Sequence, residues 1–177
     1  LREQCRRQNI TWIVDADVRG FCDNLDWGHL REVIAQRVRD GGIVRRLGKW
    51  LHAGGLESGA RSDPDQGTPQ GGVISRMVSK GCLHRVLDAW FVKDVQPRLK
   101  GRCFLTRVAD DCIIGCALEA DARRVMAGLP KRFARVRLTI HPEKTAFIAF
   151  KQPPSREPSA RGTGSVDFLG LPHSWAK

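Results

Sequence analysis

Residues 10–18, ITWIVDADV, alternate between apolar and polar or small side chains, and this two-residue period predicts a β-strand. One face of such a strand would pack into a core, while the other face would carry two carboxylates. The core face holds Val14, Ala16 and Val18, and the acidic face holds Ile13, Asp15 and Asp17.

Apolar residues recur three and four positions apart in four later segments, and this spacing predicts helices. A stretch rich in Gly, Asp and Pro, residues 53–72, follows the second helix and predicts irregular backbone. In chain order the predicted helices are 24–40, ended by Gly41 and Gly42; a helix that contains Ile43, Leu47, Trp50 and Leu51; 73–95; and 119–137, interrupted or kinked at Pro130.

Two short β-rich segments, CFLTRV at 103–108 and CIIGCA at 112–117, flank Asp110 and Asp111 and predict a hairpin. Ala-Asp-Asp is not a favoured two-residue turn. The surrounding fold or the function would therefore have to hold this turn.

The C-terminal part of the chain predicts further short strands. LTIHPEKTAFIAF at 138–150 predicts two strands around a turn, residues 151–165 predict a mobile, basic, Pro-rich loop, and VDFLGLPHSW at 166–175 is a short apolar return. The order of elements predicts an α/β (α+β) fold, in which an antiparallel sheet has helices packed on one face.

Composition narrows the class of protein. The 177 residues, 41% of them hydrophobic, suffice for one globular domain. Thirty Lys and Arg against nineteen Asp and Glu give a formal charge of +11, which favours a polyanionic partner, with nucleic acid ahead of a membrane. No apolar stretch approaches the roughly 20 residues that span a bilayer, and the N-terminus has no apolar signal-peptide core, so we predict a cytoplasmic protein with no membrane partner.

The cysteines sit mostly inside apolar runs and form no C-x-x-C pair. This pattern predicts buried, reduced thiols rather than disulfides or a zinc site. The six are Cys5, Cys22, Cys82, Cys103, Cys112 and Cys116.

Asp110 and Asp111 raise a geometric question, because adjacent residues on a strand point to opposite faces. If the turn redirects one of them, both can serve one site, and two central antiparallel strands would bring Asp17 beside the hairpin tip. Converging carboxylates repel one another unless a cation neutralises them, and oxygen ligands without His or Cys suit Mg²⁺ or Mn²⁺. Two such ions about 4 Å apart serve in-line displacement at phosphorus. An Asp pair at a hairpin is more often a solvated turn, so both interpretations stay open on the residues alone.

Five motifs carry a resemblance to a known family. In their order and separations they are similar to the palm of reverse transcriptases, in particular those encoded by group II introns. The resemblance implies a partial palm-type domain over residues 1–175, without the start of the fingers, the thumb or the maturase segment. The motifs are VDADVRGFCDNLD, GTPQGGVIS, RVADD, HPEKT and FLGL.

The resemblance implies metal-binding and catalytic roles. The family's first-motif Asp and the first Asp of its ADD box bind two Mg²⁺ ions, which implies these roles for Asp17 and Asp110, with Asp111 beside them and Mn²⁺ as an alternative ion. The backbone carbonyl of Val18 would be a further ligand. Lys144 resembles the family's lysine near the leaving pyrophosphate, where a cation acts as general acid or offsets developing charge. A surface lysine in a turn is the alternative for Lys144.

Nucleotide contacts follow from the same resemblance. Phe21 resembles the gate that rejects a ribose 2′-hydroxyl, with Cys22 where the family usually has a second Phe; an ordinary core aromatic is the alternative. Gln70 and Gly71 lie in GTPQGG, which in the family contacts the incoming nucleotide. The alternative there is a Pro-Gly loop that caps a helix.

Primer-positioning residues come from two further motifs. Phe168, Leu169 and Gly170 resemble the family's primer-gripping hairpin, although FLGL by itself is only an apolar turn. Val108 stands where the family usually has Tyr or Phe beside the primer end. We therefore expect Val108 to weaken primer positioning and to leave the metal ligands intact.

The function that the resemblance implies is an RNA-directed DNA polymerase, with RNA template, primer strand, dNTP and intron RNA as partners. A catalytically silent, RNA-binding maturase remnant is the alternative, and it would use the basic residues along 31–49 and 123–137. The presence of all three aspartates favours catalysis. A nucleotidyl cyclase with a similar palm would leave GTPQGG and FLGL unexplained.

Overall fold

The structure, a computed structural model, describes residues 1–19, 27–52, 55–57, 60–62, 77, 80–151 and 164–175. These residues belong to two units, which are described separately. The sheet unit consists of Leu1–Val18, Trp90–Lys131 and Ile140–Lys177, and the helical unit of Arg19–Ala89 and Arg132–Thr139. Within the described ranges, no helix has the length and apolar character needed to cross a membrane.

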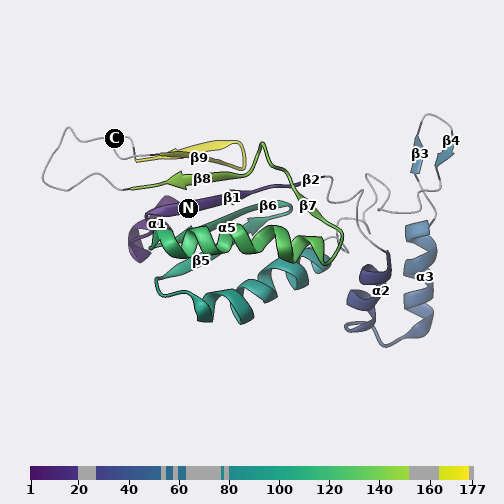
Figure 1. Cartoon of the computed structure of the whole chain (residues 1–177). Coiled ribbons are helices and arrows are strands. Elements are labelled where there is room, and N and C mark those ends of the chain that lie inside the picture. The colour runs from purple at the N-terminus through teal and green to yellow at the C-terminus, as the bar shows by residue number, and fades with distance from the viewer. Residues whose placement is uncertain are drawn as a thin grey trace, which may run out of the picture. The chain divides into compact units, whose positions relative to one another are not determined.

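Four strands form the main sheet of the sheet unit. Their order is β5 (Cys103–Val108), β6 (Asp111–Cys116), β1 (Trp12–Ala16) and β8 (Ala146–Ala149). Every neighbouring pair is antiparallel, and β6 and β1 occupy the centre (Figure 1). The predicted antiparallel sheet is therefore confirmed, with the first motif on β1 and Asp111 at the start of β6, the two central strands.

Both faces of β1 are buried at its middle, because Ile13 and Val14 each expose 0% of their surface. The prediction that only one face of this strand is core is therefore wrong. Ile13 packs on the acid-bearing face against α1 (Arg2–Gln8) and β9 (Ser165–Phe168), and such burial stabilises by about 1.5–3 kcal/mol per large apolar side chain. The buried members of this cluster are Cys5, Ile10, Ile13, Phe104, Ile113, Phe150, Val166 and Phe168.

Helix α5 (Glu119–Ala134) covers the opposite face of the sheet (Figure 1). Its apolar residues lie three and four positions apart, and Ala122, Val125 and Leu129 are all buried. Pro130 lies inside the helix, which continues to Ala134, so the helix is not interrupted there. The predicted helical layer on one face of the sheet is confirmed.

Helix α1 is not predicted by the sequence pattern, because only Cys5 among its seven residues is buried. The helix ends at Asn9, which adopts a left-handed conformation with φ 52° and ψ 45°. The next residue, Ile10, donates its N–H to the Cys5 carbonyl at 2.9 Å, a bond that is typical of a left-handed helix end. This end directs the chain into β1.

Residues 80–98 are helical and agree with the described part of the predicted helix 73–95. Two wide π-type segments, η1 (His84–Asp88) and η2 (Phe91–Val95), precede a 3₁₀ turn, η3 (Gln96–Arg98). The predicted apolar stripe is buried at Leu83, Val86, Leu87 and Phe91.

The first two helices of the helical unit differ from the prediction in their bounds. Helix α2 (Trp27–Ala35) ends five residues early, and α3 (Gly41–His52) begins at the two glycines where the sequence predicts a break. The Asp40 carboxylate accepts the backbone N–H groups of Gly42 at 2.7 Å and of the next residue at 3.1 Å, and this N-cap allows the helix to start at glycine.

The expected irregular stretch 53–72 contains a short antiparallel pair, β3 (Gly55–Glu57) and β4 (Ala60–Ser62), so that prediction is wrong for these residues. The GTPQGG motif at 67–72 lies outside the described residues.

The remaining short strands are β2 (Val18–Arg19), β7 (Thr139–Ile140) and β10 (Leu171–Ser174). Strand β10 pairs antiparallel with β9, across a turn in which both central residues have positive φ. The predicted loop 151–165 lies outside the described residues except at its ends, and its last residue already belongs to β9.

Candidate active site at the acidic edge of the sheet

Asp17 and Asp111 face each other at one end of the two central strands. The β1–β6 register ends at the pair Ala16 and Cys112, and Asp17 and Asp111 are the next residues in each strand direction. The predicted meeting of the first motif with the hairpin tip is thereby confirmed. Asp111 shares the face of Ile113, which belongs to the cluster under α1 and β9.

Asp110 lies in the turn rather than in a strand. Val108 pairs with Asp111, which leaves Ala109 and Asp110 as a two-residue turn. This position releases Asp110 from the strict alternation of strand side chains, so it can lie beside Asp111. The turn is exposed at both residues.

Ala109 holds the turn in a conformation that L-residues rarely adopt, with φ 56°. Left-handed backbone at a residue other than glycine costs about 1–2 kcal/mol. Arg107 contributes to the opposing stabilisation, because its guanidinium donates to the Ala109 carbonyl at 2.7 Å. The surrounding fold therefore holds an unfavourable turn, as the Ala-Asp-Asp sequence predicts.

Two carboxylates at this edge, those of Asp111 and Asp15, have a raised pKa. Burial raises the pKa of Asp111, the charges of Asp110 and Asp17 raise it further, and Lys144 opposes the rise. Burial also raises the pKa of Asp15 to about 6, with additional contributions from Asp111 and Asp17. The edge is therefore a site of concentrated negative charge, which a cation would relieve.

Asp15 is not among the predicted site residues. The available signal is its two-residue spacing from Asp17, which places both side chains on the acidic face of β1. The family resemblance does not identify Asp15, because it implies a role only for Asp17, the second Asp of VDADV.

Lys144 lies at the site that the motif order predicts for it. Its Nζ is 3.4 Å from Asp17 Oδ2, although 66% of the Lys144 side chain is exposed. The turn that carries it is fixed to Asp17 by the N–H of His141, which donates to the Asp17 carbonyl at 2.8 Å. Thr145 then closes the turn by donating its N–H to the His141 carbonyl at 3.0 Å. The HPEKT motif therefore places a cation beside the first-motif aspartate.

The other predicted site residues differ in how exposed their side chains are. Val108 is 45% exposed at the end of β5, and Leu169 is 51% exposed in the β9–β10 turn beside Gly170. Phe168, in contrast, is only 7% exposed and belongs to the core cluster. The predicted nucleotide contacts at Phe21, Gln70 and Gly71 lie outside the described residues.

The donor set suits a hard divalent cation. Carboxylate and backbone carbonyl oxygens are the ligands that Mg²⁺ prefers. The buried Val18 follows Asp17 directly, so its carbonyl is the expected backbone ligand. Over the described ranges, no three His, Cys, Asp or Glu side chains already stand close enough together to hold a metal ion. The negative charges of Asp110 and Asp17 contribute to the raised pKa of Asp111, and a bound cation would offset this repulsion.

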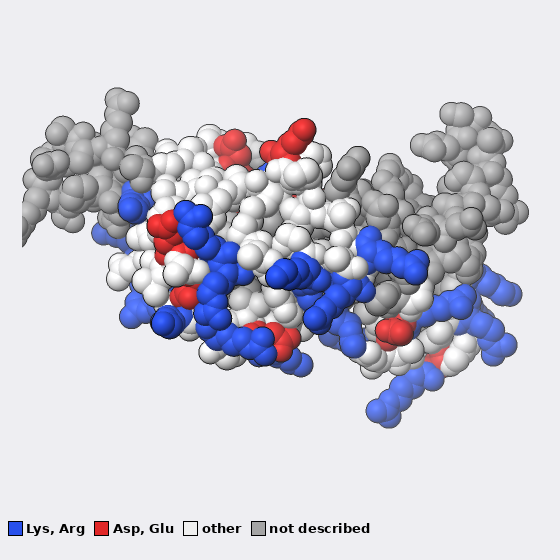
Figure 2. Space-filling view, in the orientation of Figure 1, with Lys and Arg blue, Asp and Glu red and all other residues white. Residues whose placement is uncertain are grey.

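Positive charge lies over other parts of the surface. Figure 2 shows Lys and Arg side chains crowded over the face that carries α5. The sheet unit therefore combines an acidic edge with a basic helical face, an arrangement that is typical of proteins that act on polyanions.

Comparisons with known proteins agree with this geometry. The sequence matches the family described as reverse transcriptase (RNA-dependent DNA polymerase) over residues 1–173. It is 33% identical over 75 residues to the group II intron-encoded protein LtrA of Lactococcus lactis subsp. cremoris, which is 42% of this chain and 12% of LtrA. It is 28% identical over 80 residues to protein YkfC of Escherichia coli (strain K12), which is 45% of this chain and 21% of YkfC. The chain thus corresponds to a small part of these relatives.

Solved structures support the fold. Telomerase from Candida tropicalis, in complex with a TWJ fragment of telomeric RNA, superposes with a TM-score of 0.70 at 16% identity, covering 98% of this chain and 30% of the telomerase chain. The apo enzyme, truncated from its C-terminal domain, gives a TM-score of 0.66 at 16% identity, covering 98% of this chain and 36% of that chain. The sheet of the palm, its motif order and the family match agree, and the chain belongs to the reverse transcriptase (RNA-dependent DNA polymerase) family.

Proposed function

We propose that the acidic edge is the active site of an RNA-directed DNA polymerase, and that residues 1–175 are a partial palm domain of that enzyme. The observation that carries the proposal is the meeting of Asp17 and Asp111 at the ends of β1 and β6, beside Asp110. The Lys144 ammonium group, 3.4 Å from Asp17, adds the cation that pyrophosphate release requires.

Asp17, Asp110 and Asp111, with the Val18 carbonyl, would hold two Mg²⁺ or Mn²⁺ ions. When bound, such ions activate the attacking oxygen and stabilise the leaving oxygen. The chain itself supplies the negative charge that gathers the ions, and the antiparallel register of β1 and β6 fixes the separation of the ligands. Lys144 offsets the charge that develops on the leaving group.

The reaction is a nucleotidyl transfer. The 3′-oxygen of a primer forms a bond to the α-phosphorus of a dNTP and loses its proton to solvent, while the bond from the α-phosphorus to the β-phosphate oxygen breaks and pyrophosphate leaves. Phe21, Gln70 and Gly71 would contact the nucleotide. Val108 and the Phe168–Gly170 hairpin would position the primer.

The relatives suggest the partners. LtrA is a group II intron-encoded protein, which supports intron RNA as a partner of this chain, and the telomerase was solved with an RNA fragment, which supports an RNA template. We place the protein in the cytoplasm, where buried thiols such as those of Cys5 and Cys116 remain reduced.

Primer extension with Asp110→Asn tests the proposal. The substitution keeps the size of the side chain and removes a charge that a metal ion needs, so we expect Mg²⁺-dependent extension of a primer on an RNA template to be abolished while RNA affinity changes little. Glu119→Gln, which removes a carboxylate from the exposed face of α5, is the matched control and should extend like the parent. Extension by Asp110→Asn at the parent rate would remove the central assignment.

A further inference from the structure

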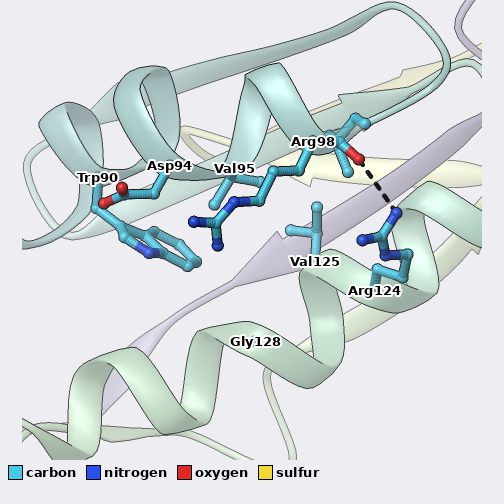
Figure 3. A pocket seen from close by; sticks show the side chains of 8 residues that line it. Trp90, Asp94, Val95, Arg98, Arg124, Val125 and Gly128 are labelled. Atoms are coloured by element: carbon cyan, nitrogen blue, oxygen red, sulfur yellow. Dashed lines mark hydrogen bonds between the residues drawn. The ribbon is translucent and has the colours of Figure 1, made fainter.

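A shallow pocket lies between η2–η3 and α5 in the sheet unit (Figure 3). We name it the helix pocket. Its volume is about 130 Å³, well below the roughly 300–1,000 Å³ of sites that enclose a whole small molecule. It can therefore take one ring of a ligand whose remainder stays outside. The lining residues are Trp90, Asp94, Val95, Arg98, Leu99, Arg124, Val125 and Gly128.

The helix pocket combines an aromatic wall with an apolar floor. The half-buried indole of Trp90 extends from the helix toward α5, where the absence of a side chain at Gly128 lets the edge of the indole pack close to the helix (Figure 3). A Cβ atom at Gly128 would lie 3.9 Å from the indole, at ordinary contact distance. Val125 supplies buried apolar surface beside them. An aromatic wall over an apolar floor suits the flat face of a nucleobase.

Two guanidinium groups flank this space. Arg98 extends along the pocket toward Trp90, and Arg124 approaches from α5, where it donates one N–H to the Arg98 carbonyl at 3.1 Å (Figure 3). In the described part of the chain neither guanidinium forms an ion pair, and each presents several donors in a fork that matches a phosphate. With Asp94 as the lone acid among the lining residues, the pocket carries excess positive charge.

Further positive charge of the same unit is exposed at Lys100, Arg102 and Lys131, which come shortly after Arg98 and Gly128 in the chain. Arg123 contributes less, since Glu119 accepts from it at 2.6 Å and its guanidinium lies 5.0 Å from the Phe147 ring centroid. The pocket has room for one ring, and the basic residues around it attract negative charge. The ligand that matches both features is a polyanion that carries rings at regular intervals.

We propose that the helix pocket binds single-stranded RNA, with one base stacked on Trp90 and a neighbouring phosphate held by Arg98 and Arg124. The choice of RNA among polyanions rests on the proposed function. The surface is separate from the acidic edge, because α5 covers the sheet face of Phe147, which pairs with Val14, whereas the acids share the face of Ile13. RNA bound here therefore leaves the acidic edge accessible. It also increases the affinity for RNA of a chain that spans only part of its relatives.

Fluorescence anisotropy with a labelled RNA of about 12 nucleotides tests the binding of phosphate by the two arginines. The measurement is made in EDTA without dNTP, so that its result is independent of metal-dependent extension. For Arg98→Gln/Arg124→Gln we expect affinity to fall about tenfold, and the slope of log affinity against log salt to become shallower by about 0.7 for each phosphate that the variant no longer neutralises. The charge-matched control Arg2→Gln/Arg6→Gln, on the exposed face of α1, should change affinity much less. An equal fall in affinity for both double variants would overturn the pocket and leave only general charge attraction.

Gly128 variants test the stacking of the base. Gly128→Leu adds a side chain where the edge of the indole already lies at contact distance, so it should displace Trp90 and weaken RNA binding about tenfold, while binding of inorganic polyphosphate, which has no bases, should stay unchanged. Gly128→Ala, whose Cβ fits, should bind RNA nearly as the parent does. In addition, RNA that contains 5-iodouridine should photocrosslink to the peptide that carries Trp90. Unchanged RNA binding by Gly128→Leu, or crosslinks that exclude this peptide, would overturn the proposal even if Asp110→Asn behaves as predicted.

Discussion

At the scale of single residues, the acidic edge depends on where two strands end. Asp17 and Asp111 lie directly beyond the last registered pair of β1 and β6. The pairing of these two strands is therefore enough to place the two residues opposite each other. Lys144 joins them because the His141 N–H fixes its turn to the Asp17 carbonyl. A shift of one residue in the pairing of β1 with β6 would place these two carboxylates on opposite faces of the sheet.

Val108 stands where the family resemblance predicts an aromatic residue beside the primer end. Its side chain is 45% exposed at the end of β5, so a larger ring fits without displacing the core. Val108→Tyr should therefore raise the rate of primer extension by restoring an aromatic ring beside the primer end. Val108→Leu is the matched control, because it adds bulk without a ring. An unchanged rate for Val108→Tyr in a single-turnover assay would contradict the primer-positioning role of this residue.

The positions of the residues at the acidic edge could be predicted unequally from the sequence. Asp17, Asp110, Asp111 and Lys144 follow from motif order, because each motif fixes both a residue type and a place in the sheet. Asp15 could not be selected in this way, since its significance arises from burial and from the neighbouring charges that raise its pKa to about 6.

At the scale of elements, the buried acid in the first turn of α5 ties the helix to the loop before β5. The Asp121 residue is 2% exposed, and its carboxylate accepts the N–H groups of Lys100 at 3.0 Å and Gly101 at 2.7 Å. Removal of the carboxylate leaves two part-buried N–H donors without this acceptor, and an unsatisfied donor costs about 1–3 kcal/mol when it is fully buried.

Asp121→Ala should therefore lower the free energy of unfolding by about 2–4 kcal/mol, as measured by urea denaturation. The matched control is Glu119→Ala in the same turn, where the exposed ion pair with Arg123 contributes less than about 1 kcal/mol. Equal decreases for the two variants would show that the Asp121 hydrogen bonds do not hold the loop.

The sequence predicts the long periodic elements well and the short ones poorly. The central hairpin and α5 carry repeated apolar positions, and the structure confirms them. Helix α1 buries only Cys5, so no period marks it. The start of α3 at Gly41 depends on the Asp40 cap rather than on helix propensity, and glycine alone indicates the opposite.

At the scale of the whole chain, the thiols behave as core side chains. Burial raises the pKa of Cys5 and of Cys82 to about 11 and that of Cys116 to about 12, from an ordinary value of 9.0. These groups stay protonated in the folded chain at pH values where the unfolded chain forms thiolates. Their contribution to stability is therefore complete below about pH 9 and is lost as the pH rises toward 11–12.

Alkylation by iodoacetamide measures this difference. At pH 9 we expect Cys5, Cys82 and Cys116 to remain unmodified in the folded chain. The thiolate is the reactive form, and its population at these cysteines is about a hundredfold lower in the folded chain than in the unfolded chain. The urea-unfolded chain at the same pH is the control and should be labelled at these positions. Rapid labelling of the folded chain at these cysteines, located by peptide mass spectrometry, would contradict their burial.

Primer extension by the parent chain and its Asp17→Asn variant tests the central claim most directly. Both are incubated with a primer annealed to an RNA template, dNTPs and Mg²⁺, and RNA binding is measured in parallel. We predict incorporation by the parent alone, with equal RNA affinity for the two. Equal extension by both chains would contradict an active site built on Asp17. Extension by neither, with RNA binding intact, would contradict polymerase activity of this chain by itself and leave RNA binding as its function.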